Sequence, residues 1–313
     1  MIIQILLLII GFIILIKGAD IFVDGASNIA HNYKVPKMII GLTIVAFGSS
    51  APDFAISIKS MLNGSREIVL GNVIGSNIMN ILLIVGICSL IHNLKVSGNT
   101  VKKEIPFAML FTLLLTVVMN DKIFNNTENI ITRSDGIIIL LFFTIFIHYL
   151  FSLISAKQYK EKGEAKHNLK KSIIYTILGI ILIILGSHFT IESACKISEY
   201  LNISERIISL TIISLFSTLP ELITSVIATK KGEYDLAIGN VIGSNIFNIG
   251  MVLGLPVVIF GSISVTFKWF DIIVLLLSII LLFIYTRKDK EVGKKEGISL
   301  LIIFLIYYTL VII

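Results

Sequence analysis

One polar segment occurs twice in this chain, 168 residues apart. The sequence GNVIGSNIMNI at 71–81 returns as GNVIGSNIFNI at 239–249. Upstream of each copy, at the same offset, a proline precedes an acid, in FGSSAPDF at 47–54 and in LFSTLPEL at 215–222. The duplication predicts two halves with related folds. Polar, helix-breaking residues at matching positions of two apolar halves are typical of the binding site of a transporter.

Apolar stretches of membrane-spanning length fill most of the sequence. Hydrophobic residues make up 56% of the chain and charged residues only 15%, which excludes an ordinary soluble domain. A helix needs about 20 apolar residues to cross a bilayer, so the sequence predicts an all-α polytopic membrane protein with ten spans. The predicted spans are 2–30, 36–61, 68–91, 105–119, 136–155, 171–197, 206–229, 235–260, 269–286 and 297–313.

The net charge of +6 indicates membrane orientation rather than nucleic-acid binding, because lysines and arginines gather in alternate loops. With the N-terminus outside, the inward loops hold 18 of them and the outward loops hold 7. Cytoplasmic loops carry the excess of positive charge in membrane proteins. We therefore expect a multi-pass protein of the cell membrane with both termini outside and a cytoplasmic segment 157–170.

The 168-residue offset extends upstream of the polar motifs. It aligns GFIILIKGADIFVDGA at 11–26 with GIILIILGSHFTIESA at 179–194. We therefore expect a five-helix repeat at 1–156, the charged linker 157–170, and a second five-helix repeat at 171–313. Because five is odd, the second repeat enters the membrane from the opposite side, which predicts an inverted-topology repeat with its site at the repeat interface.

Several other functions find no support in the sequence. The chain has no GxxxxGK[ST] motif that could couple transport to nucleotide hydrolysis, so we expect an ion gradient to supply the energy. The first apolar run lacks the basic start and the cleavage site of a signal peptide, and we interpret it as a retained helix. The linker is too short for a folded regulatory domain.

The proline–acid steps predict a polar break inside an apolar helix. Proline removes a backbone donor and clashes with the preceding turn, which frees carbonyl groups around 46–49. Such carbonyls are tolerated at membrane depth only where they line a cavity or are satisfied by other groups. Ser49, Ser50 and Asp53 share one face of the helix by their spacing, and Ser217, Thr218 and Glu221 repeat the pattern.

The polar atoms of these motifs are oxygen donors of the kind that hard cations prefer. Ser76 and Asn80 are four residues apart on one helix face, as are Ser244 and Asn248. Ca²⁺ takes about six to eight oxygen ligands, and two carboxylates would offset its charge. Histidine and cysteine are missing from both motifs, which argues against zinc, copper or iron. Charged groups at mid-membrane are functional by default, and this applies to Asp53 and Glu221.

Other residues of the motifs have a structural interpretation. We expect Gly71, Gly75, Gly239 and Gly243 to allow close helix packing. For Asn72, Asn77, Asn240 and Asn245, hydrogen bonds between helices and a role in the site are equally favoured. For Asp20, Asp24 and Glu192, which lie nearer helix ends, we favour interfacial or local structural roles.

Together, the two motif pairs resemble the two α-repeats of the cation/Ca²⁺ exchanger superfamily, specifically its sodium/calcium exchanger branch of prokaryotic type. The family pattern is G-[TS]-S-x-P-[DE] followed by G-N-x-x-G-S-N, and it occurs here twice, in order. The resemblance implies ten helices in inverted halves and exchange of Na⁺ for Ca²⁺ by alternating access. The ion ligands that it implies are Ser49, Ser50, Asp53, Ser76, Asn80, Ser217, Thr218, Glu221, Ser244 and Asn248.

The sequence departs from the family pattern at two positions. Potassium-dependent members and some prokaryotic relatives have Asp at the position of Asn248, so Asn248 argues against K⁺ cotransport. Phe216 stands where the second motif usually begins with glycine, which predicts a different bend at Leu215–Thr218.

We therefore predict a sodium/calcium antiporter rather than an enzyme. It would need no cofactor, no protein partner and no nucleic acid, and its partners would be Na⁺, Ca²⁺ and the bilayer, with a monomer sufficient. The sequence leaves a proton-coupled or K⁺-dependent exchanger of the same fold open. A cation channel and an intramembrane hydrolase using Asp53 and Glu221 are the more remote alternatives.

Overall fold

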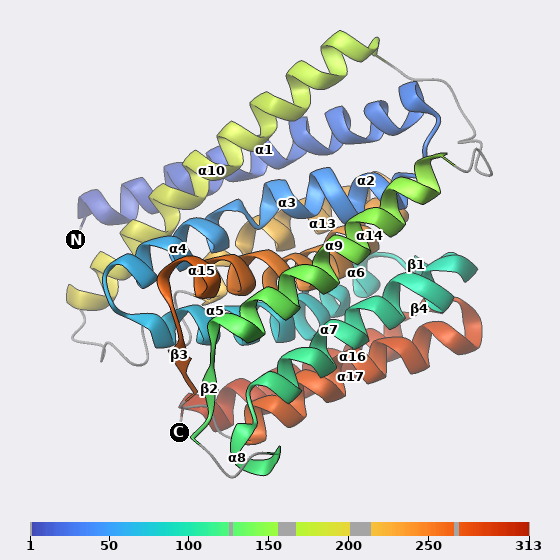
Figure 1. Ribbon diagram of the computed structural model, residues 1–313. Helices are drawn as coiled ribbons and strands as arrows, with labels where there is room; N and C mark the ends of the chain where they lie inside the picture. The colour runs from blue at the N-terminus through green and yellow to red at the C-terminus, as the bar shows by residue number, and fades with distance from the viewer. Residues whose placement is uncertain (1, 125–127, 156–166, 201–213, 266–268, 313) are drawn as a thin grey trace.

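The protein is a bundle of long helices in the computed structural model, which describes residues 2–124, 128–155, 167–200, 214–265 and 269–312 (Figure 1). The elements of the first half are α1 (Ile2–Tyr33), α2 (Lys37–Ile40), η1 (Gly41–Val45), α3 (Ala46–Ser49), α4 (Ala51–Leu62), α5 (Arg66–Met79), η2 (Asn80–Val85), α6 (Gly86–Ile91), β1 (Leu94–Lys95), η3 (Thr100–Glu104), α7 (Ile105–Val118), α8 (Asp121–Phe124), β2 (Ile130–Ile131) and α9 (Arg133–Ser155). Those of the second half are α10 (Leu169–Tyr200), α12 (Ser214–Ser217), α13 (Leu219–Lys230), α14 (Tyr234–Phe247), η5 (Asn248–Leu253), α15 (Gly254–Phe260), β3 (Ile263–Ser264), α16 (Trp269–Asp289), β4 (Glu291–Val292) and α17 (Lys294–Ile312). The segments named η are π-helical.

Six helices among the described residues are long and apolar enough to cross a membrane. A bent pair, Lys37–Ser49 with Ala51–Leu62, makes a seventh candidate. The chain is therefore a helical, polytopic membrane protein, as its apolar runs predict. The start of the predicted span 206–229 and most of the predicted linker 157–170 lie outside the described residues. The six helices are Ile2–Tyr33, Arg66–Ile91, Arg133–Ile154, Leu169–Ala194, Tyr234–Phe260 and Trp269–Asp289.

The helices break where the proline–acid steps predict it. Pro52 lies in the first turn of α4, and the chain bends by 45° at Ser50. Pro220 stands in the same position of α13, after Thr218. Ser50 has φ −82° and ψ 5°, and Thr218 has φ −83° and ψ −7°, so the backbone at the two breaks is nearly the same. The different bend predicted from Phe216 is therefore wrong at this position.

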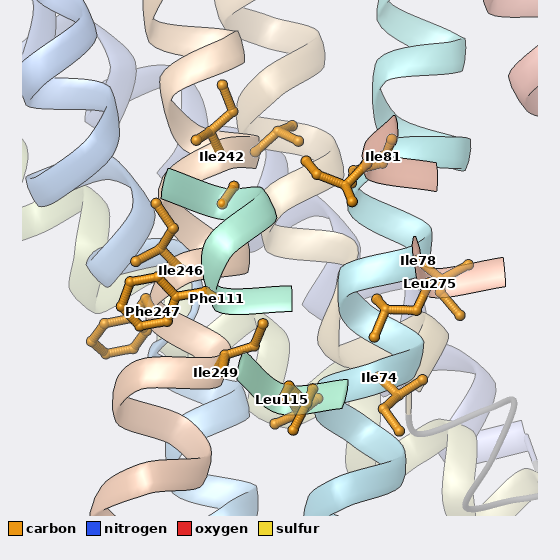
Figure 2. Close-up of a cluster of buried hydrophobic side chains, with 14 of the residues drawn as sticks. Ile74, Ile78, Ile81, Phe111, Leu115, Ile242, Ile246, Phe247, Ile249 and Leu275 are labelled. Carbon is orange, nitrogen blue, oxygen red and sulfur yellow. The ribbon is translucent and has the colours of Figure 1, made fainter. Parts of the chain in front are cut away.

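The two GNVIGSNI segments form the buried centre of the bundle. In the most apolar stretch of the α5–α6 and α14–α15 helices, 78% of the residues are buried, against 22% in α1. Figure 2 shows the packing around them, with Phe111 and Leu115 of α7 and Leu275 of α16 among the side chains. Each helix widens into a π-helical segment, which begins at Asn80 in one and at Asn248 in the other. Such wide turns occur frequently at functional sites.

Helices α1 and α10 lie side by side at one face of the bundle (Figure 1). Their backbones touch at glycines seven residues apart, which fall on one face of each helix. A Cβ atom at Gly25 would lie 2.5 Å from the backbone nitrogen of Thr176. At Gly186 it would lie 2.7 Å from the nitrogen of Leu15. We call this contact the glycine seam; it comprises Gly11, Gly18, Gly25, Gly179 and Gly186.

Two short antiparallel strand pairs join the halves at opposite ends of the bundle (Figure 1). Leu94 of β1 pairs with Val292 of β4 at one end, and Ile131 of β2 pairs with Ile263 of β3 at the other. In Figure 1, α1 begins and α17 ends on the side where β2 and β3 lie. Each pair thus contains one strand from each half.

Candidate ion-binding site

All ten predicted ligands are buried where the two helix breaks meet α5 and α14. None of them is more than 2% exposed. The breaks contribute three residues each, and α5 and α14 with their π-helical segments contribute the other four. These elements contact one another across the two halves, α3 with α14 and α12 with α5. The structure therefore brings together residues that are 168 positions apart in the sequence.

Glu221 is held by a residue of the other half. The Ser50 hydroxyl donates a hydrogen bond of 2.6 Å to Oε1 of Glu221. The Ser50 and Ser244 hydroxyl oxygens lie 3.0 Å apart. In the corresponding place of the other half, Thr218 Oγ1 lies 3.2 Å from Ser76 Oγ. Each break thus contacts the GNVIGSNI helix of the opposite half.

Asp53 is held through an asparagine that also contacts the second break. Asn72 Nδ2 donates to Asp53 Oδ1 at 3.0 Å, and Asn72 Oδ1 accepts from the Ser217 hydroxyl at 3.0 Å. Asn240, the counterpart of Asn72, accepts from Ser49 at 2.9 Å. Its amide group does not reach a carboxylate, because it donates to Ser225 Oγ at 2.9 Å and to the Glu221 carbonyl. The two halves therefore hold their acids differently.

Four buried side-chain oxygens of the site have no hydrogen-bond partner among the described residues. They are Asp53 Oδ2, Glu221 Oε2, Asn80 Oδ1 and Asn248 Oδ1. The 168-residue offset relates Asp53 to Glu221 and Asn80 to Asn248. A buried acceptor without a partner costs free energy, which a bound cation would recover. In the described part of the chain, no ion pair neutralises either carboxylate.

The chemistry of these donors fits a hard cation. The described residues contain no group of three or more His, Cys, Asp or Glu side chains that could hold a metal. The site instead offers two carboxylates together with hydroxyl and carboxamide oxygens. Ca²⁺ binds such mixed oxygen sets, whereas zinc and copper favour nitrogen and sulfur.

The structure resolves the interpretation of the remaining motif residues. Asn72 and Asn240 link helices by hydrogen bonds, and their partners include the predicted ligands Asp53, Ser217 and Ser49. Asn77 and Asn245 accept hydrogen bonds from Asn248 and Asn80. The sequence alone did not distinguish a packing role from a role in the site for these four asparagines, although their repetition in both halves indicated that they belong to the motif.

The motif glycines pack as expected where the structure shows contacts. A Cβ atom at Gly239 would lie 2.9 Å from the Met38 carbonyl oxygen, and at Gly243 it would lie 2.8 Å from Leu42 Cα. At Gly75 it would lie 2.8 Å from the Ser214 hydroxyl. These glycines let α5 and α14 approach the opposite half closely.

The chain as a whole is similar to known sodium/calcium exchangers. The family described as "Sodium/calcium exchanger protein" matches residues 3–152 and 171–313. A putative antiporter, CaxA of Alkalimonas amylolytica, is 35% identical over 98% of both chains. The sodium/calcium exchanger MaX1 of Methanosarcina acetivorans is 29% identical over 96% of both. The solved structure of the sodium-calcium exchanger NCX_Mj, soaked with 10 mM Na⁺ and no Ca²⁺, is 29% identical and superposes with a TM-score of 0.84 over 98% of both chains.

Proposed function

The chain belongs to the sodium/calcium exchanger family, and we propose that it exchanges Na⁺ for Ca²⁺ at the buried site between its two halves. The observation that carries this proposal is the set of four unpartnered oxygens on Asp53, Glu221, Asn80 and Asn248. They are buried, related in pairs by the repeat, and of the chemical type that both ions bind. Sodium/calcium antiport itself follows from the family and from the curated relatives.

We assign ten residues to ion binding. Asp53 and Glu221 would bind Ca²⁺ jointly, since their two negative charges offset the charge of one Ca²⁺ ion. The hydroxyl and carboxamide oxygens would complete the Ca²⁺ shell and form the flanking Na⁺ sites. The full set is Ser49, Ser50, Asp53, Ser76, Asn80, Ser217, Thr218, Glu221, Ser244 and Asn248.

Competition for the two carboxylates would couple the ions. Na⁺ and Ca²⁺ need the same oxygens, so the binding of one ion would expel the other. If more than two Na⁺ ions replace one Ca²⁺ ion, each cycle moves net charge, and transport is electrogenic. The ion gradient then supplies the energy without nucleotide hydrolysis.

We further propose the ten-span, inverted-repeat architecture, with repeats at 1–156 and 171–313 joined by the linker 157–170. The strand pairs support inversion, because β1 and β3 follow the two GNVIGSNI helices and lie at opposite ends of the bundle (Figure 1). The reciprocal contacts across the 168-residue offset support it as well. In such transporters one bundle moves against another around a fixed site. Here α1 and α10 would move together against the other helices.

The membrane orientation is part of the same proposal. The excess of lysine and arginine in alternate loops supports a cell-membrane protein with both termini outside and residues 157–170 in the cytoplasm. A single chain contains the whole site, so a monomer would suffice for exchange. Neither a cofactor nor a protein partner enters the mechanism.

Reconstituted protein tests the function directly. In liposomes loaded with Na⁺, with pH clamped and K⁺ omitted, an outward Na⁺ gradient should drive ⁴⁵Ca²⁺ uptake above its equilibrium level. Glu221→Gln protein, purified in the same way, is the control for leak. Uptake that follows a pH gradient and ignores Na⁺ would show proton coupling, and uptake that requires K⁺ would show a potassium-dependent exchanger. Uptake that never exceeds equilibrium would show a channel, and cleavage of a peptide would be needed to support a hydrolase.

A further inference from the structure

Two asparagines outside the ligand set connect the halves at the start of the π-helical segments. Asn77 Nδ2 donates to the backbone carbonyl of Asn245 at 3.4 Å, and Asn245 Nδ2 donates to the backbone carbonyl of Asn77 at 3.3 Å. Each also accepts a hydrogen bond on its side-chain oxygen. Asn80 Nδ2 donates to Asn245 Oδ1 at 2.9 Å, and Asn248 Nδ2 donates to Asn77 Oδ1 at 3.3 Å. We call these four residues the asparagine clasp.

The backbone carbonyls determine which way every carboxamide of the clasp points. A carbonyl oxygen can only accept, so the group that faces it must be the NH₂ of Asn77 or Asn245. The oxygen of the same carboxamide then faces the other way and can only accept. Asn248 and Asn80 must therefore present their NH₂ groups to it, and this turns their own oxygens away from the clasp.

The oxygens turned away from the clasp are the two that lack partners. Asn80 Oδ1 and Asn248 Oδ1 have no hydrogen-bond partner among the described residues, and both side chains are at most 1% exposed. A carboxamide in the opposite orientation would present two N–H donors to the ion, which repel a cation. The orientation of these two groups thus decides whether the carboxamides themselves attract or repel the ion.

We propose that Asn77 and Asn245 are positioning residues that fix the carboxamides of Asn80 and Asn248 with oxygen toward the transported ion. The inference rests on the ion site proposed above and goes beyond it, because Asn77 and Asn245 bind no ion themselves. Each acts on the ligand of the opposite half, so Asn77 orients Asn248 and Asn245 orients Asn80. The orientation of an ion ligand in one repeat therefore depends on an asparagine of the other repeat.

A double-mutant cycle can test this pairing. Asn77→Ala removes the acceptor for Asn248 Nδ2, so the Asn248 carboxamide can rotate and the apparent KM for Ca²⁺ should rise roughly tenfold, the usual size of a lost hydrogen bond at a binding site. The maximal exchange rate should change much less. Replacing Asn248 by Asp removes the need for orientation, since both carboxylate oxygens accept. Asn77→Ala should therefore have no effect, or a favourable one, on the KM of Asn248→Asp protein.

The crossed combination serves as the matched control. In Asn80→Asp protein, Asn77→Ala should still raise the KM roughly tenfold. The converse holds for Asn245→Ala. Its effect on the KM should vanish in Asn80→Asp protein and persist in Asn248→Asp protein. Asn120→Ala removes a buried asparagine that, among the described residues, donates its side-chain hydrogen bond to a helix carbonyl, and it should leave the KM unchanged. If Asn77→Ala protein is not recovered, Asn77→Ser can replace it in the test. The serine hydroxyl lies one atom nearer the backbone than Asn77 Oδ1, so it also withdraws the acceptor from Asn248 Nδ2.

The outcomes separate the clasp from the ion site. Equal effects of Asn77→Ala in the Asn80→Asp and Asn248→Asp proteins would overturn the pairing and leave a packing role only. An unchanged KM in Asn77→Ala protein would overturn positioning altogether. Failure of the proposed ion site would appear instead as normal exchange by Asp53→Asn and Glu221→Gln proteins, whatever the clasp variants do.

Discussion

Ser50 and Glu221 are 171 positions apart in the sequence, and the serine hydroxyl donates a hydrogen bond of 2.6 Å to the glutamate. Ser50 stands at the break before α4 in the first half, while Glu221 lies in the first turn of α13 in the second. The carboxylate that the second half contributes is therefore held in place by the backbone break of the first.

Removal of this hydroxyl should weaken ion binding. In Ser50→Ala protein, Oε1 of Glu221 loses its partner, and a buried acceptor without a partner costs about 1–3 kcal/mol. We expect a higher KM for Ca²⁺ in the Na⁺-driven uptake assay, with normal yield of folded protein. Ser278→Ala is the control, because within the described part of the chain this buried serine on α16 bonds to a helix carbonyl and to no site residue. An equal KM for the two variants would contradict a role of Ser50 at the site.

Neutralising either acid should abolish Ca²⁺ exchange. Asp53→Asn and Glu221→Gln each leave one negative charge, which cannot offset the two charges of Ca²⁺ in a buried site. Both variants should remain folded, because the change preserves side-chain volume. Uptake of ⁴⁵Ca²⁺ together with elution as a single species in gel filtration checks this expectation, and retained exchange by either variant would show that the carboxylates are not ligands.

The glycine seam should not accept even one methyl group. In Gly186→Ala protein, the new Cβ atom would lie 2.7 Å from the Leu15 nitrogen, so the backbones of α1 and α10 would have to separate. Overpacking of this kind costs about 1–3 kcal/mol. We expect a lower Tm in detergent and slower exchange. Gly98→Ala is the control, since its nearest neighbour is the flexible end of Lys290 at 3.7 Å, and it should leave Tm unchanged.

An ion-pair cluster joins α1 to the rest of the bundle near Lys231. Lys231, in the turn after α13, lies 2.7 Å from Asp20 and 2.9 Å from Asp24 of α1. The position 168 residues earlier is Asn63, which carries no charge. If α1 and α10 move during exchange, these ion pairs favour the arrangement seen here. In Lys231→Asn protein, spin labels on α1 and α14 should report a broader distance distribution at this end.

The neighbouring residue provides the control for this prediction. Lys230 is exposed and forms no ion pair among the described residues, so Lys230→Asn should leave the distribution unchanged. The pairs of Lys231 are partly exposed and therefore weakened by salt, so high ionic strength should reproduce part of the variant's effect. Identical distributions in Lys231→Asn and wild-type protein would show that the cluster does not hold α1.

Much of the fold and the site was predictable because the sequence signals are local. Apolar runs predict helices whatever their neighbours, and Pro52 and Pro220 break a helix through their own backbone. The buried position of Asp53 and Glu221 also follows from the apolar residues on either side. The broken helices and the burial of all ten predicted ligands agree with the sequence.

The contacts between the halves could not be predicted in the same way. That Asn72 holds Asp53 while Asn240 bonds to Ser225 depends on small differences between two nearly identical motifs. The sequence favoured interfacial or local structural roles for Asp20 and Asp24, but it could not identify their partner Lys231, which lies more than 200 positions away. The break at Thr218 shows the reverse case: its backbone angles match those of Ser50, although Phe216 stands where the first motif has Gly48. Proline determines the break in both motifs.

The glycine seam has a consequence for how tightly the two ion fluxes are linked. Because the backbones of α1 and α10 are in direct contact, neither helix can shift far without carrying the other. If the two helices form the gate, as proposed above, their movement as one body would uncover one aqueous pathway only by covering the other. No state would then offer a continuous route for ions, so the Na⁺ gradient would not be dissipated by slippage between turnovers.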